Sequence, residues 1–299
     1  MTAGLVLEQA FNGLQFGMVL FLMAVGVTLA FGVMNLINLA HGSMLMLGAY
    51  FIAAAAQKIT AYPLAFVAAL MLTAVAAVLL EVVVMRPLYR MGHLDQVLAT
   101  FGVSIAVNEA VIMVWGREAM FVAPPDWLDG TVALTETISY PLYRLAITAV
   151  AALAGLALWL LLARTRLGMR IRAGAENGDI VGALGVNVRL LFIGVFVISS
   201  LLAALGGVML GPLIAVQSGM GDPLLILALA VVVIGGVGSL KGALVASLAV
   251  GLIDTFGRMI WPQWLGDVVG NIVANASVYI LMALVIAVRP SGLYGNHAA

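Results

Sequence analysis

The densest group of polar residues in this sequence interrupts a long apolar stretch, in Gly32-Val-Met-Asn-Leu-Ile-Asn-Leu-Ala-His-Gly-Ser43. Polar side chains are costly in hydrocarbon unless they face a bundle interior or a water-filled path. Asn and Gly favour non-helical backbone, so the stretch predicts a broken helix. On one interpretation it forms a cavity wall, with helix ends facing a solute, from Asn35, Asn38, His41, Gly42 and Ser43. On the other it is an ordinary connector in which Asn caps the second helix. The connector interpretation explains the Asn residues, but it does not explain His41, Gly42 and Ser43 in the next helical turn.

A second glycine-rich interruption, Gly235-Gly-Val-Gly-Ser-Leu-Lys-Gly242, falls late in the other half of the chain. Paired broken segments in corresponding halves are typical of a transporter site at the membrane midplane. This hypothesis adds Gly236, Gly238 and Ser239 to the candidate path. The alternative is close helix packing through small residues at GxxxG spacing, as in the pairs Gly207/Gly211 and Gly238/Gly242.

Other chemistry finds little support in the sequence. There is no cysteine, and His93 and His297 are expected in cytoplasmic segments, so His41 is the one histidine left in a predicted span and a His-based metal site has no ligand set. No glycine-rich loop is followed by Lys and Ser or Thr at the spacing of a nucleotide-binding loop. We expect no cofactor, and no ATP hydrolysis by this chain alone.

Intramembrane proteolysis is the main competing enzyme class. Gly219-Met-Gly-Asp222 matches the GxGD pattern of aspartyl proteases, which need a second carboxylate to share a proton. Asp254 is the only candidate, and Asp222 is expected in an outer loop before Pro223. No GxSxG turn supports a serine protease either. The sequence therefore disfavours an intramembrane enzyme.

Three further acidic residues lie in or beside apolar runs. Glu81 precedes Arg86 by about one turn, and Asp254 lies four residues before Arg258, the spacing at which opposite charges meet on a helix. We expect both pairs to be structural. Glu109 is expected to pair or to extend toward water, the alternative being a role in a proton or substrate path.

The elements that position these residues are membrane helices. The chain has 299 residues, of which 64% are hydrophobic and 9% charged, a balance that no soluble core accommodates. Its zero net charge excludes a basic nucleic-acid-binding face. The prediction is an all-α polytopic membrane protein, a single transmembrane domain over 1–299, with eight or nine spans, some interrupted. The apolar runs are 11–33, 38–57, 62–85, 97–115, 142–163, 190–213, 224–238, 242–256 and 271–288, of which 224–238 and 242–256 are short.

Orientation follows from the basic residues, because short loops rich in Lys and Arg stay in the cytoplasm. One side of the predicted membrane carries Arg86, Arg90, Arg164, Arg166, Arg170, Arg172, Arg189, Lys241 and Arg289; the other carries Lys58, Arg117, Arg144 and Arg258. We therefore expect the C-terminus in the cytoplasm. Nine crossings, or eight with a re-entrant piece, satisfy this pattern.

The segment 164–189 carries five arginines against Glu176 and Asp179 and is too long for a tight turn. Its apolar positions Ile171, Ala175, Val181 and Leu184 predict a short amphipathic helix on the cytoplasmic face. Such a helix suits a groove on a partner protein; the alternative is a helix lying on anionic lipid.

Several blocks of the sequence, which follow one another along the chain, resemble a known family. The pattern Gly-x-x-x-Arg-Ala-x-x-x-Asn, continuing through Ala183-Leu-Gly-Val-Asn-Val-Arg189, is similar to the coupling segment of ABC importer permeases. Four further blocks resemble the branched-chain amino acid permeases of the LivH type: Asn35 to Tyr50, Arg86-Pro-Leu-Tyr-Arg90, Ile234 to Ala243, and Arg289-Pro-Ser-Gly-Leu-Tyr-Gly295.

The resemblance implies a permease subunit in the inner membrane of a bacterium. Its partners would be a second permease of the LivM type or another copy of itself, two cytoplasmic ATPases that bind the ATP, and an extracytoplasmic solute-binding protein. Residues 170–185 would transmit the ATP-driven motion, with Arg170, Arg172, Ala173, Glu176, Asn177, Ala183 and Gly185 contributing.

One departure from the family concerns the solute. The family often has an acidic residue after His-Gly, where this chain has Ser43. The solute would be a branched-chain or other small apolar amino acid; amides, urea and aromatic acids are the alternatives among related permeases.

Overall fold

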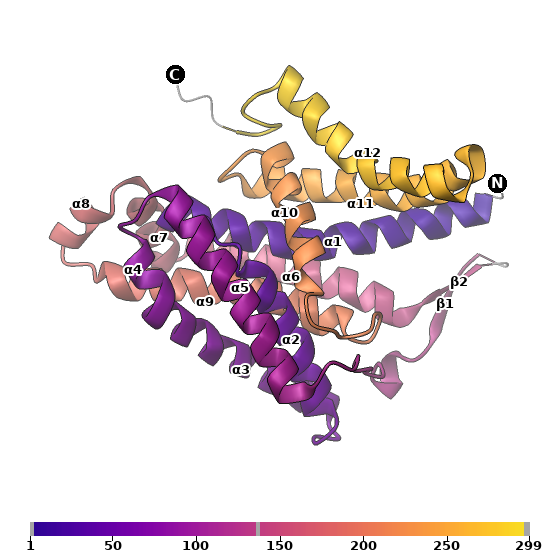
Figure 1. Cartoon of the computed structure of the whole chain (residues 1–299), viewed down its shortest axis with the longest axis horizontal. Coiled ribbons are helices and arrows are strands. Elements are labelled where there is room, and N and C mark those ends of the chain that lie inside the picture. The colour runs from indigo at the N-terminus through magenta and orange to yellow at the C-terminus, as the bar shows by residue number, and fades with distance from the viewer. Residues whose placement is uncertain (1–2, 136–137, 296–299) are drawn as a thin grey trace. The chain divides into compact units, whose positions relative to one another are not determined.

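The computed structural model describes residues 3–135 and 138–295, which form helices and one β-hairpin (Figure 1). The chain divides into two compact units. Unit 1 comprises residues 1–24, 124–153 and 226–299, and unit 2 comprises 25–123 and 154–225. His297 lies outside the described residues.

Unit 2 contains most of the helices. They are α2 (His41–Ala56), α3 (Tyr62–Leu80), the π-helical turn Glu81–Met85, α4 (Arg86–Leu88), α5 (His93–Trp115), α7 (Arg166–Glu176), α8 (Gly178–Ala183) and α9 (Val188–Leu210). Unit 1 contains the 3₁₀ turn Asp126–Leu128, strands β1 (Thr131–Thr135) and β2 (Ile138–Pro141), α11 (Leu240–Leu265) and α12 (Asp267–Val288). Three helices run through both units: α1 (Ala3–Met34), α6 (Leu142–Arg164) and α10 (Gly221–Gly235).

All nine predicted apolar runs are helical, which confirms the all-α membrane fold. Within the described residues, seven helices are long and apolar enough to span a bilayer, and α2 and α10 are shorter. The lengths differ from expectation in one place. The run from Gly242, expected to end at Phe256, continues to Leu265 with Pro262 inside the helix. The short helices are therefore α2 and α10, not α10 and α11.

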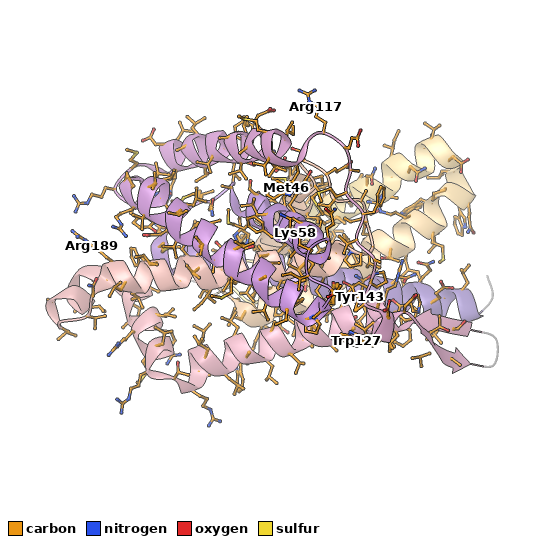
Figure 2. The ribbon with its side chains drawn as sticks, turned by 90° about the horizontal axis from the view of Figure 1, so that it is seen from below. Met46, Lys58, Arg117, Trp127, Tyr143 and Arg189 are labelled. Atoms are coloured by element: carbon orange, nitrogen blue, oxygen red, sulfur yellow. The ribbon has the colours of Figure 1, made fainter. Side chains whose placement is uncertain are left out.

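The core of unit 2 is built on α2, which packs against both α3 and α9 (Figure 1). The contact with α9 depends on glycines: a Cβ built on Gly48 would lie 2.5 Å from the carbonyl oxygen of Ala204, and one on Gly207 would overlap the carbonyl of Leu45. Small residues thus allow the close approach of two backbones in hydrocarbon. Figure 2 shows Met46 of α2 among the crowded inner side chains, whereas Arg117 and Arg189 project outward.

Unit 1 uses the same device between α1 and α11. Gly13 and Gly17 of α1 face the backbone of α11 at Gly251 and Ser247. α11 also packs along α12 (Figure 1). The GxxxG spacing predicts only part of this packing, since a Cβ at Gly238 would meet nothing within 4 Å.

Both predicted ion pairs are present. Glu81 is 1% exposed and accepts a hydrogen bond of 3.1 Å from Arg86. Burial, followed by the charge of Glu81, raises the pKa of Tyr89, whose hydroxyl donates to Oε1 of Glu81 at 3.2 Å. In unit 1, both carboxylate oxygens of Asp254 accept from Arg258 at 2.9 Å. Glu109 is exposed and has no ion pair within the part of the chain that the structure describes.

Candidate functional site

The first predicted interruption is a real break between α1 and α2. α1 ends at Met34, residues 35–40 are not helical, and α2 begins at His41. Asn35 has a φ of 49° and its N–H bonds to the carbonyl of Phe31, so it ends α1 in the left-handed conformation that Asn tolerates. The backbone groups of residues 35–40 therefore need partners other than a helix of their own.

Those partners come from a polar stripe on α5. Gln96, Thr100, Ser104 and Asn108 follow each other at intervals of four residues, so they lie on one face of the helix. The first three are at most 5% exposed, and Asn108 is half-buried. None of these four side chains was predicted as a site residue, although their i, i+4 spacing in an apolar helix was a readable signal.

The polar side chains of this α5 face form hydrogen bonds with the backbone of residues 35–40. Oε1 of Gln96 accepts from the N–H of Ile37 at 3.4 Å, and Oγ1 of Thr100 accepts from the N–H of Leu39 at 3.1 Å. One helical turn further along α5, the Ser43 hydroxyl donates to Ser104 Oγ at 3.2 Å. The break is thus attached to α5 at Ile37 and Leu39, and the first turn of α2 is attached at Ser43.

The start of α10 meets the same stripe. Oδ1 of Asp222 accepts from the Ser104 hydroxyl at 3.4 Å, and Oδ2 accepts from Nδ2 of Asn108 at 3.3 Å. Asp222 was expected in an outer loop; it lies instead in the first turn of α10, because Gly221 and Gly42 have no side chains to keep α10 and α2 apart. We call Ser43, Ser104, Asn108 and Asp222 the midpoint cluster.

The midpoint cluster lies halfway along a membrane-spanning helix, since Ser104 is midway in the 23 residues of α5. Two short helices begin there: α2 has 16 residues and α10 has 15, and a full crossing needs about 20. Their N-terminal turns, which carry partial positive charge, meet at Gly42 and Gly221. Discontinuous helices that begin near the midplane are typical of transporter substrate sites.

Three other predicted path residues occupy different positions around the break. Asn38 is 7% exposed; its Oδ1 accepts from the N–H of Ala40, and its Nδ2 has no partner within the described residues. It is not the N-cap of α2, which is Ala40. His41 is buried against Gly26, and Asn35 is exposed.

The second predicted interruption is also a break, and the C-terminal segment closes it. Gly236 and Gly238 have φ of 97° and 84°, and Ser239 caps α11 by accepting from the N–H of Gly242. The last carbonyls of α10, at Ile234 and Gly235, accept from the N–H groups of Leu293 and Tyr294 at 2.8 and 3.0 Å. Two of the sequence blocks that carry the family resemblance therefore pack together in unit 1.

The arginine-rich segment forms two short helices rather than one. Asn177 ends α7 and caps α8 by accepting from the N–H of Ile180 at 3.0 Å. Of the predicted apolar positions, Ile171 and Val181 are buried, whereas Ala175 is exposed and Leu184 is 78% exposed. All of the predicted coupling residues are exposed: Arg170, Arg172, Ala173, Glu176, Asn177, Ala183 and Gly185.

The structure gives no support to aspartyl protease chemistry. Asp254 is bound by both oxygens to Arg258, so it is not free to share a proton with a second carboxylate. Within residues 3–135 and 138–295 there is also no group of three His, Cys, Asp or Glu side chains that would hold a metal ion.

Comparison with known proteins agrees with this architecture. Residues 9–288 match the family model of the branched-chain amino acid transport system permease component. The permease protein BraD of a high-affinity branched-chain amino acid transport system in Pseudomonas aeruginosa is 32% identical, over 97% of this chain and 96% of the relative. The corresponding LivH protein of Escherichia coli K12 is 30% identical, again over 97% and 96%. A probable LivH of Methanocaldococcus jannaschii is 24% identical over 92% of this chain and 88% of the relative.

No solved structure matches the chain. The relatives are transporter subunits, not enzymes, and they span nearly the whole chain. The resemblance read from the sequence blocks is confirmed, as is a multi-pass membrane protein that works as one component of a transport system. This chain belongs to the family of permease components of branched-chain amino acid transport systems.

Proposed function

We propose that this chain is the membrane-spanning permease subunit of an ABC importer that moves branched-chain or other small apolar amino acids into the cell. The observation that carries the proposal is the meeting of two short helices, α2 and α10, at a polar cluster midway along α5. In this proposal the protein lies in the bacterial inner membrane with its C-terminus in the cytoplasm, and residues 1–299 work as one permease domain.

The proposed path runs past the first break, with Asn35, Asn38, His41, Gly42 and Ser43. Asn38 supports this placement, because its buried amide donor has no partner among the described residues, which is costly unless the donor has another use. Gly236, Gly238 and Ser239 belong to the proposed path with a smaller contribution, since the C-terminal segment already occupies the neighbouring carbonyls.

In this proposal, α7 and α8 transmit the ATP-driven motion of the partner ATPases to the membrane helices. The segment 164–189 presents exposed apolar side chains, Ile180 at 59% and Leu184 at 78%, beside exposed arginines. An apolar patch rimmed by charge suits a groove on a cytoplasmic ATPase. Two such ATPases, a second permease of the LivM type or another copy, and an extracytoplasmic binding protein complete the proposed transporter.

Reconstitution tests the proposal as a whole. We expect ATP-dependent uptake of labelled leucine in liposomes when the chain is combined with its ATPases, second permease and binding protein. Uptake stimulated by urea, an amide or an aromatic acid but not by leucine would favour the alternative solutes. Uphill transport by the purified chain alone would contradict the proposal.

The path has its own test in Asn38→Leu. We expect uptake to fall while the complex still assembles, because the variant removes the buried amide and its bond to Ala40. Asn271→Leu is the matched control, since that exposed amide bonds only within its own helix, to the carbonyl of Asp267. Unchanged uptake in Asn38→Leu would remove this residue from the path.

Charge reversal tests the coupling segment. Glu176→Arg should release the ATPase during purification in mild detergent, whereas Glu118→Arg, an exposed acidic residue beyond α5, should not. Arg172 is less suitable, because its guanidinium bonds to the carbonyl of Leu162 and a change there also disturbs the α6–α7 turn. Normal copurification and transport in Glu176→Arg would count against the coupling assignment.

A further inference from the structure

We propose that Asp222, in the first turn of α10, receives the α-ammonium group of the transported amino acid at the midpoint of the membrane. This inference rests on the proposed function and adds to it the residue that recognises the charged head of the solute. The inference depends on the contacts of Asp222, whose carboxylate bonds to Ser104 and Asn108 of α5. Ser104 also bonds to Ser43 of α2.

Asp222 is a partly buried acidic residue without a cationic partner in the described part of the chain. No Lys or Arg forms an ion pair with it within the described residues, unlike Glu81 and Asp254, which both have arginine partners. Its two hydrogen bonds, at 3.4 and 3.3 Å, are long for a carboxylate, whose charge-assisted bonds are usually about 2.7–2.9 Å. An ionised carboxylate has about four acceptor sites, so Ser104 and Asn108 leave capacity for another donor.

The polar atoms around Asp222 also remain incompletely paired. Oδ1 of Asn108, on the amide that donates to Asp222, is buried and has no partner in the described chain. In the break that precedes α2, Nδ2 of Asn38, a donor on a side chain that is 7% exposed, also has no partner in the described residues. Buried polar atoms normally find partners, so the unpaired amide oxygen of Asn108 beside Asp222 is consistent with a ligand at this cluster.

A zwitterion matches this set of groups. The α-amino group of an amino acid is protonated and its carboxyl group ionised near neutral pH. The ammonium would bond to Asp222, and the carboxylate would face the N-terminal end of α2 and the amide of Asn38, where partial positive charge favours an anion. Urea and amides carry no cation for Asp222, and an aromatic acid without an amino group would be repelled by it.

The competing explanation is that Asp222 only stabilises the start of α10, as acidic residues do at helix N-termini. The chain contains a matched example of that role: Asp267 lies in the first turn of α12 and is exposed. The two roles predict different results for a variant that removes the charge of Asp222 and keeps its shape. If Asp222 binds the solute, that variant loses transport, whereas if Asp222 only stabilises α10, the variant loses stability.

The experiment uses the full transporter in liposomes with its binding protein, and measures labelled leucine transported per ATP hydrolysed. We expect Asp222→Asn to lower this ratio at least about tenfold, because a hydrogen bond between charged groups is lost. The ATPase activity stimulated by the binding protein and the melting temperature of the complex should stay near those of the wild type. Asp222→Glu should restore part of the ratio, and Asp267→Asn should leave it unchanged.

Two results would overturn the proposal. One is leucine transport by Asp222→Asn within about twofold of the wild type, which is less than one charged bond is worth. The other is a joint fall of transport, ATPase activity and melting temperature that Ser104→Ala and Asn108→Ala reproduce, because those variants keep the charge and remove only its contacts. Failure of the wild type itself to transport leucine would refute the proposed function, and this proposal with it.

Discussion

Gly42 of α2 and Gly221 of α10 lie backbone to backbone. A Cβ built on Gly42 would be 2.8 Å from the carbonyl oxygen of Gly221, and one on Gly221 would approach Gly42 more closely still. This crossing brings the residues that follow each glycine, Ser43 and Asp222, to the same side chain, Ser104. The midpoint cluster therefore depends on two residues that have no side chain.

The glycine crossing predicts a severe effect of Gly42→Val. The valine would push α10 away from α2, at a cost of about 1–3 kcal/mol for overpacking, and would separate Asp222 from Ser104. We expect a lower melting temperature in detergent and loss of leucine uptake. Gly102→Val on α5 is the control, because a Cβ there meets nothing within 4 Å. Equal melting temperatures for the two variants would contradict the close crossing.

Thr100→Val tests the attachment of the break to α5. The variant leaves the N–H of Leu39 without its acceptor in a partly buried position, which costs about 1–3 kcal/mol. Thr73→Val is the matched control: Thr73 is equally buried, but its hydroxyl bonds only to the carbonyl of Ala69 in its own helix. Thermal unfolding of both variants checks the difference, and a Thr73→Val variant that is as unstable as Thr100→Val would argue against the attachment.

The Glu81–Arg86 pair predicts a non-additive double substitution. Arg86→Met leaves the buried carboxylate of Glu81 without its cation, and we expect a loss of about 1–3 kcal/mol because Arg86 is itself 37% exposed. Adding Glu81→Gln removes the uncompensated charge, so the double variant should be more stable than Arg86→Met alone. A double-mutant cycle on apparent unfolding free energies measures this coupling. Strict additivity would mean that the pair contributes nothing.

Ser43 and Asp222 both bond to Ser104. This shared contact predicts that the carboxylate of the midpoint cluster can be moved from position 222 to position 43 and still support uptake. Ser43→Asp combined with Asp222→Asn moves the charge from α10 to α2 and leaves the net charge unchanged. We expect this double variant to take up leucine several-fold faster than Asp222→Asn alone, since a carboxylate at either position reaches Ser104. Ser200→Asp with Asp222→Asn is the control, because Ser200 is buried on α9 and its hydroxyl has no hydrogen-bond partner in the described part of the chain. Uptake no better than that of Asp222→Asn would show that position 222 is specifically required.

Much of the fold was readable from local patterns. The long apolar runs predicted the helices that cross or enter the membrane. The Asn and Gly residues at 35–42 and 235–242 predicted both breaks. The ion pairs followed from spacing along a helix. The coupling segment was less readable, because a single amphipathic pattern did not reveal that Asn177 ends one helix and begins another.

The candidate site was only half predicted. The residues of the first break were identified, but their partners on α5 lie about 60 positions away in the sequence, as Ser104 does from Ser43. Asp222 was considered only for proteolysis and was expected in a loop. Its true position depends on the contact of Gly221 with Gly42, which no local pattern encodes.

Local sequence patterns were enough to identify a helical membrane protein, the positions where its helices break, and the family to which it belongs. Hydrophobic length, backbone preference and motif order are properties of neighbouring residues, so they are legible without a structure. The tertiary structure alone decided that α2 and α10 begin at the middle of α5 and that Asp222 joins Ser43 there. That arrangement arises from close packing between segments far apart in the chain, and packing is settled by the shapes of surfaces that meet only after folding.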